Sequence, residues 1–390
     1  MKHLILLLFF QIFLTSTSHA GIIPIAARFD GVGGTYGLGY QQNFSESRLL
    51  VGAAGGDVQV YGLLYTNYLS KDLELSIGHL NFSGLSLLTT YNRGLTDDEN
   101  ARYVLNINGS ATAIGSKWWL LDDALTFNFS TISSTVSFDD YQDEYGNNIN
   151  LAGANLFDIN TLNIKLGLDF NFYDNNRSPS SGFGFNTSVS NLSGRTGQSD
   201  QMIFDYGING LIPTLSFQTL AIKAKISEAI VSVNGSYDTA AEIRSALGAN
   251  CSSIADSTER TNCENLENEL VDYILANNTR GTANPLGGSS GLRSFREQRF
   301  RAAHSALLGL ELRNDLSAFV GKFSEGSRIE FNLFYDLGFA NEDKTELFES
   351  SKYSTGAVLA YVKDSFAVRL TAAQGSDDTN SWSLGFGSSL

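Results

Sequence analysis

No apolar run in this sequence is long enough to cross a bilayer as an α-helix, which needs about 20 residues. The mostly apolar run from Leu4 to Leu14 is too short, follows the basic residue Lys2 and leads into Ser18-His19-Ala20. A basic start, a short apolar segment and a small-x-Ala ending predict a secretory signal peptide over residues 1–20. We therefore expect cleavage after Ala20 and an exported mature chain, residues 21–390.

Charged residues and proline are both scarce. Charged residues make up 17% of the chain, against ~25% in soluble domains, so many exposed positions must be uncharged. The four prolines, Pro24, Pro179, Pro213 and Pro285, each fall where a turn is expected. The formal net charge is −15, which repels nucleic acid and excludes it as a partner. Acidic loops at an outer surface would instead suit divalent-cation bridging to lipopolysaccharide.

The dominant pattern is alternation of apolar and polar residues. From Leu162 to Tyr173 the even-numbered residues are all apolar and the odd-numbered residues are nearly all polar. Successive side chains of a strand point to opposite faces, so the segment predicts a strand with one apolar and one polar face. Its length suits a tilted membrane strand better than a globular strand of about 5–6 residues. Similar alternation recurs near Leu125, Phe183, Ile329, Phe366 and Trp382.

The fold class that we predict is all-β, a transmembrane antiparallel barrel with its apolar face toward lipid and its polar face toward a wet lumen. The polar faces are rich in Asn, Ser, Gly and Thr, and the chain ends on an aromatic-rich strand, which favours a barrel over a large soluble β-sandwich or β-helix. We count 16 strands, an even number, as bacterial barrels have. The expected starts are Gly34, Arg48, Val58, Leu73, Leu85, Val104, Ala124, Leu162, Gly182, Met202, Leu215, Ser305, Ile329, Tyr353, Ser365 and Ser381.

One connection, residues 232–304, interrupts the alternation. Thr239-Ala240-Ala241-Glu242 matches a capping box, which predicts a short helix that stops near Gly248. An apolar stripe from Leu266 to Leu275 has helical spacing and predicts a second helix that ends at Asn277-Asn278. We expect this stripe to be buried by packing between the two helices, inside one very long loop.

Residues that commonly carry chemistry are few. Cys251 and Cys263 predict a disulfide in an exported protein, with two free thiols as the alternative. No signature surrounds His79 or His304, the histidines of the expected mature chain, so a hydrolase is not expected. The acidic stretch around Asp143 lacks the spacing of a calcium-binding loop. We expect neither enzymatic activity nor a cofactor or metal.

Four motifs stand in a particular order: Asp174 to Gly182, Leu292-Arg293-Ser294-Phe295, Gly309 to Arg313, and Phe334 to Gly338. Together they resemble the barrel domain of the bacterial surface antigen family, the BamA/TamA-type outer-membrane assembly factors. The resemblance implies 16 strands and a sixth external loop that folds into the lumen with an Arg-bearing tip. It is clearest from about Leu166 to the C-terminus.

The resemblance implies a lumen clamp in which Arg293, next to Phe295 at the loop tip, pairs with Glu311 and Asp336 on the next two strands. The alternation independently places both acids on the polar, lumen-facing side. A guanidinium between two carboxylates would form strong, charge-assisted hydrogen bonds. The alternative is that these residues are ordinary lumen charges of a passive pore.

Two departures from the family pattern bear on function. Ser294 stands where the family has Gly, and residues 21–44 leave no room for the periplasmic POTRA domains of BamA and TamA. We therefore expect an outer-membrane barrel that acts in protein or lipid assembly or translocation together with a separate periplasmic partner, in contact with outer-membrane lipid and lipopolysaccharide. The alternative is a passive channel or a structural surface antigen.

Overall fold

A computed structural model describes residues 20–29, 33–56, 59–96, 102–121, 124–143, 145–154, 159–174, 179–194, 197–288, 291–321, 327–363 and 366–388. The expected signal peptide lies outside these residues, apart from Ala20. The strands are β1 (Ala20–Phe29), β2 (Gly33–Asn43), β3 (Ser47–Gly56), β4 (Gln59–Ser70), β5 (Leu73–Thr90), β6 (Arg102–Leu120), β7 (Leu125–Asp143), β8 (Asn148–Ile149), β9 (Ile159–Tyr173), β10 (Gly182–Ser193), β11 (Asp200–Leu215), β12 (Gln218–Val233), β13 (His304–Asp315), β14 (Ser327–Asn341), β15 (Lys352–Lys363), β16 (Phe366–Gly375) and β17 (Asn380–Ser388). The helices are α2 (Ala240–Leu247), η2 (Cys251–Ser253), α3 (Ser257–Arg280), α4 (Ser317–Val320), η4 (Lys344–Glu346) and η5 (Ser376–Asp378).

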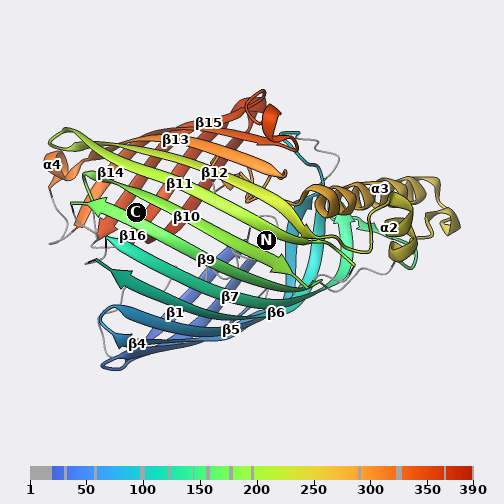
Figure 1. Cartoon of the computed structure of the whole chain (residues 1–390), viewed down its shortest axis with the longest axis horizontal. Helices are drawn as coiled ribbons and strands as arrows, with labels where there is room; N and C mark the ends of the chain where they lie inside the picture. The colour runs from blue at the N-terminus through green and yellow to red at the C-terminus, as the bar shows by residue number, and fades with distance from the viewer. Residues whose placement is uncertain are drawn as a thin grey trace.

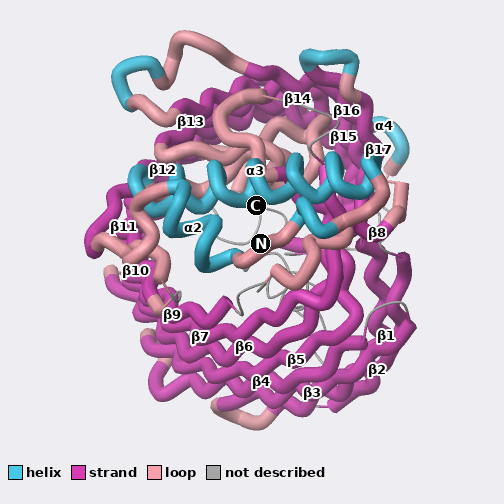
Figure 2. Tube along the Cα trace, turned by 90° about the vertical axis from the view of Figure 1, so that its right-hand side faces the viewer, coloured by secondary structure: helices cyan, strands magenta, loops and turns pink. Residues whose placement is uncertain are grey.

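The strands form one antiparallel sheet that curls into a barrel (Figures 1 and 2). Each long strand pairs with the next one along the chain, and the two-residue strand β8 pairs only with β7, which also pairs with β9. The registers of the described residues include no pairing of β1 with β17. Within the described part of the chain no helix is both long and apolar enough to traverse a bilayer. The predicted all-β antiparallel fold is confirmed.

The predicted count of 16 long strands agrees with the structure because two errors cancel. The sequence predicts no strand before Gly34, yet Ala20–Phe29 forms β1. Its Pro24, which the sequence assigns to a turn, is tolerated because β1 has a single partner strand, β2, among the described residues. The expected strands at Leu73 and Leu85 are one strand, β5, which an irregularity between Phe82 and Leu85 interrupts. Pro213, also assigned to a turn, lies in β11 beside a register shift.

The connections alternate between two ends of the barrel. The end that carries the β12–β13 connection, here called the mouth end, also carries the long connections 91–101, 144–158 and 342–351. The opposite end, the turn end, carries short links such as 71–72 and 216–217. Counted from β1, the β12–β13 connection is the sixth at the mouth end, which is the position that the sequence predicted.

Most of the barrel has the predicted sidedness. Leu166 is 42% exposed on the outer face of β9, whereas Asn163 and Thr161 on the opposite face are buried. The mouth ends of β4 to β7 differ from the prediction, because apolar residues there point inward. Val60, Leu80, Phe82, Leu105 and Tyr141 join Leu247, Ile254, Leu266 and Leu270 of the sixth loop in one apolar cluster.

The helices of the sixth loop lie across the mouth end (Figure 2). Thr239 and Glu242 form the predicted capping box of α2, and Gly248 ends that helix in the left-handed conformation. Helix α3 runs to Arg280, a little beyond the predicted end. Cys251 and Cys263 form the predicted disulfide. The apolar stripe packs only partly against α2, because Leu266 and Leu270 also cover the apolar wall of the barrel.

Candidate functional site: the sixth-loop clamp and latch

Beyond α3, the sixth loop turns back into the barrel and forms a tight tip. Leu286 and Phe300 pair as a β-bridge at its base. Within the tip, the Gly288 amide donates to the Phe295 carbonyl at 3.0 Å, and Gly287 donates to Gly291 at 2.8 Å. Leu292 adopts a positive φ of 63° and is fully buried. This backbone folding directs the next residue, Arg293, toward the inner faces of β13 and β14.

Arg293 contacts both of the acids that the sequence analysis selected. Its Nη1 donates to Glu311 Oε2 at 2.8 Å, its Nε donates to Asp336 Oδ2 at 2.9 Å, and its Nη2 donates to Asp336 Oδ1 at 3.0 Å. The guanidinium carbon also lies 3.5 Å from the centre of the Phe334 ring. We call Arg293, Glu311 and Asp336 the clamp. A bidentate pair backed by an aromatic face is the geometry for which arginine, unlike lysine, is suited.

The clamp is partly shielded from solvent, since the side chains of Asp336, Glu311 and Arg293 are 5%, 19% and 24% exposed. Glu311 is shared with a second arginine, Arg313, whose Nε donates to it at 3.2 Å, and Asn332 also donates to it at 3.2 Å. Removal of Arg293 would leave a buried, unpaired carboxylate, which typically costs about 3–5 kcal/mol. The clamp can therefore hold the loop tip against β13 and β14.

Phe295 lies outside the polar part of the clamp. It packs edge-to-face against Phe300, with ring centres 4.8 Å apart, in an apolar cluster with Leu286, Leu292 and Leu307. Its contribution is therefore burial of apolar surface beneath the tip, not contact with the acids.

Ser294, at the tip of the loop, is bonded to neighbouring strands. Its amide donates to Ser354 Oγ of β15 at 3.1 Å, and the two hydroxyls lie 2.6 Å apart. On the other side, the Ser381 hydroxyl of β17 donates to the Arg293 carbonyl at 2.7 Å. The tip is thus attached to β13, β14, β15 and β17. Sequence reasoning missed Ser354 and Ser381, because neither residue type nor spacing distinguishes them from other inward-facing serines.

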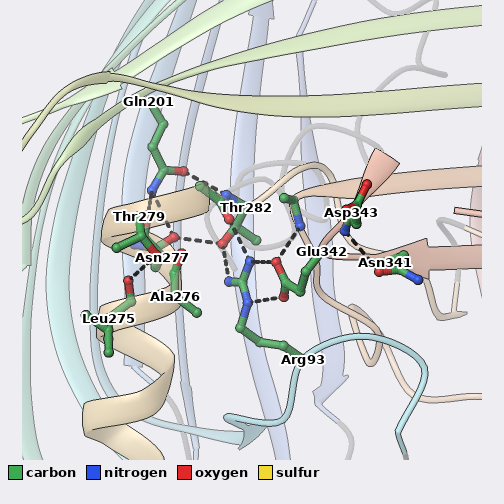
Figure 3. A network of polar contacts seen from close by, with 12 residues as sticks. Arg93, Gln201, Leu275, Ala276, Asn277, Thr279, Thr282, Asn341, Glu342 and Asp343 are labelled. Carbon is green, nitrogen blue, oxygen red and sulfur yellow. Dashed lines mark hydrogen bonds and ion pairs between the residues drawn. The ribbon is translucent and has the colours of Figure 1, made fainter. Parts of the chain in front are cut away.

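A second polar network, which the sequence analysis also missed, holds the sixth loop at the mouth end (Figure 3). Arg93, just after β5, donates through Nε to Glu342 Oε1 at 2.5 Å and through Nη2 to Oε2 at 2.9 Å. Glu342 follows β14, so the pair joins connections that lie far apart in the sheet. The remaining Arg93 donors bond the Gly281 carbonyl at 2.6 Å and Thr282 Oγ1 at 2.8 Å, where α3 ends. We call Arg93 and Glu342 the latch.

Buried amide side chains continue the latch into the wall of the barrel. Gln201 of β11 donates to the Asn277 carbonyl at 3.0 Å and accepts from the Thr282 amide at 3.1 Å. Thr282 Oγ1 also donates to Asn277 Oδ1 at 2.7 Å (Figure 3). The C-terminus of α3 is therefore fixed to β11, to the β5–β6 connection and to the β14–β15 connection. Arg93 and Glu342 are 249 positions apart, and nothing in either local sequence signals the pairing.

The described residues contain no group of His, Cys, Asp or Glu that could hold a metal ion. His79 lies on the outer face of β5 and bonds Thr112 and Asn81 at 2.8 Å each. The turn between β9 and β10 is organised by Asp174, which accepts from the Ser180 hydroxyl and from two backbone amides. These hydrogen bonds, led by that from Ser180, hold the pKa of Asp174 at about 2.

The sequence matches no protein-family model and no curated protein. The fold is similar to BamA from Haemophilus ducreyi lacking POTRA domains 1-3, with a TM-score of 0.54 and 13% identity over 95% of this chain and 70% of that one. It is also similar to CdiB from Escherichia coli, with a TM-score of 0.55 and 10% identity over 96% of this chain and 62% of that one. At such identities the likeness concerns the barrel architecture alone.

Proposed function

We propose that this chain is an outer-membrane barrel of a Gram-negative bacterium that assists the assembly or translocation of proteins or lipids. In this proposal the sixth loop closes the barrel at rest, and the chain works with a separate periplasmic partner. The observation that carries the proposal is the clamp, in which the tip of an internal loop joins an arginine to acids on two neighbouring strands. The latch fixes the base of the same loop, so the loop is held inside the barrel at two places.

The architecture supports the same proposal. A barrel whose outer face is apolar is suited to lipid, and its acidic mouth-end loops are suited to contact with lipopolysaccharide through divalent cations. The similarity to BamA and CdiB barrels makes this class of function the reasonable one to test first. Because the clamp residues bond the loop tip to neighbouring strands, we propose a binding and gating role for them.

Conductance in planar bilayers tests the closed state. We expect the wild-type protein to be nearly closed and Arg293→Ala to raise its open probability. Arg313→Ala is the matched control. It removes a lumen cation that also contacts Glu311, but it leaves the hydrogen bonds of Arg293 to Glu311 and Asp336 in place. A large, steady wild-type conductance that Arg293→Ala leaves unchanged would favour the passive channel or structural surface antigen instead.

Site-specific crosslinking in intact cells tests the partner. A photoreactive residue at Lys71, which is 86% exposed in a turn-end link, should capture a periplasmic protein. The same residue at Glu349, which is exposed at the mouth end, should not capture it. Recovery of lipid alone from both positions would contradict a role that depends on a periplasmic partner.

A further inference from the structure

The inner wall beside the clamp is rich in cations although the whole chain is acidic. The register from β12 to β16 places Lys223, Lys225, Arg313, Arg328 and Arg369 on inward-facing positions, where Arg293 joins them. The acids of this wall are already engaged. Glu311 and Asp336 pair with Arg293, Glu330 pairs with Arg328, and Asp315 caps the turn at Ser317.

Two of these cations take part in none of the salt bridges of this wall. Lys223 and Lys225 alternate with the outward-facing Ile222 and Ile226, and neither forms an ion pair within the described part of the chain. Their Cα atoms are about 7 Å apart, as expected for positions i and i+2 of a strand. The flexible side chains can therefore converge on one small anion.

The two lysines adjoin the clamp. Lys223 lies opposite Gly309, where a Cβ atom would be 3.7 Å from Lys223 Cβ and 3.3 Å from Asp336 Oδ1. Asp336 accepts two hydrogen bonds from the Arg293 side chain and is the acid nearest to this glycine. Because Arg293 already neutralises Asp336, the local field that the lysines create is not cancelled. Lys225, one pleat nearer the mouth, is exposed within the barrel.

The distribution of acids complements this wall. Helix α3, across the mouth, carries five acids (Glu259, Glu264, Glu267, Glu269 and Asp272) against two arginines. The helix across the mouth is thus acidic, whereas the wall formed by β12 to β16 is basic. A lumen lined by fixed charge of one sign concentrates counter-ions and sets the selectivity of a pore.

We infer that Lys223 and Lys225 form a binding site for small phosphate- or carboxylate-bearing solutes, which makes the lumen anion-selective whenever the sixth loop is released. The site faces the lumen and not the lipid, so its ligand is a dissolved anion. The inference goes beyond the proposed function, since a translocation barrel and a passive channel could each contain such a site.

The first test uses the closed wild-type protein in detergent, with inorganic pyrophosphate as the probe. A short pulse of acetic anhydride is followed by peptide mass spectrometry. Pyrophosphate should lower the acetylation of Lys223 and Lys225 severalfold and leave the control Lys71 unchanged. Equal acetylation with and without pyrophosphate would overturn the inference.

The second test measures the reversal potential of the Arg293→Ala barrel in a tenfold KCl gradient. We expect the sign that denotes chloride preference, and a shift toward zero when Lys223→Gln and Lys225→Gln are added but not when Lys71→Gln is added. A cation-preferring potential, or no shift, would overturn the inference. An Arg293→Ala barrel that carries no current would count against the proposed gating instead, and the acetylation test would still decide the anion site.

Discussion

Breaking the latch should release helix α3 from the mouth while the clamp remains closed. Arg93 is 9% exposed and Glu342 is 20% exposed, and they share two hydrogen bonds. Replacing one member leaves the other buried and unpaired, which costs about 3–5 kcal/mol. If about 3 kcal/mol of this cost lowers the free energy of local unfolding of α3, hydrogen exchange of its backbone amides should become about two orders of magnitude faster.

The assay is hydrogen exchange of the folded barrel, measured by mass spectrometry on Arg93→Gln, Glu342→Gln and the double variant. Exchange in α3 should rise in both single variants and partly recover in the double variant, because the double variant buries no lone charge. The control is the pair Lys344–Glu228, which also involves the β14–β15 connection but has a lysine that is 63% exposed. Removing that exposed pair should cost only about 0.2–1 kcal/mol.

Two results would refute this reasoning. If α3 exchanges at the wild-type rate in Arg93→Gln, then the apolar cluster alone holds the helix and the latch contributes nothing. If Arg93→Gln also opens the barrel to the same conductance as Arg293→Ala, then clamp and latch are one cooperative unit and not two attachments.

Three further outcomes follow from local geometry. Replacing Cys251 and Cys263 by Ser should destabilise the helical unit by about 3 kcal/mol, as expected for a closed loop of this length, and exchange in α2 reports it. The pKa of Asp174 is lowered to about 2, so its ionised form stabilises the β9–β10 turn. This contribution to the free energy of unfolding is complete above the ordinary pKa of Asp and is lost as the pH falls through about 2. Asp174→Asn should abolish that pH dependence in an unfolding titration. Gly182→Ala should lower the free energy of unfolding by more than 1 kcal/mol, because φ is 119° and a Cβ atom would lie 2.2 Å from a β9 carbonyl oxygen; unchanged urea unfolding would contradict that strain.

The fold follows largely from local pattern. Alternation fixes which face of β9 is apolar, since a shift of one residue would turn Leu162 and Ile164 toward the interior. Thr239, Glu242 and Gly248 delimit α2 through hydrogen bonds and a backbone conformation that involve only near neighbours. The sequence therefore determined the barrel class and the helical unit. The strand number agreed only because the unrecognised β1 and the division of β5 into two strands offset each other.

Only the tertiary structure decided how the sixth loop is held. The clamp acids were found because alternation and a family resemblance both pointed to the same wall, whereas Ser354 and Ser381 carry no distinguishing signal. The latch joins residues 249 positions apart, and such a pair is defined by the curling of the sheet and not by either segment. The inward apolar residues of β4 to β7 are another case, because their partners are helices of a distant loop. The alternation along a strand shows which face is apolar, but only the tertiary structure shows whether that face contacts lipid or another part of the chain.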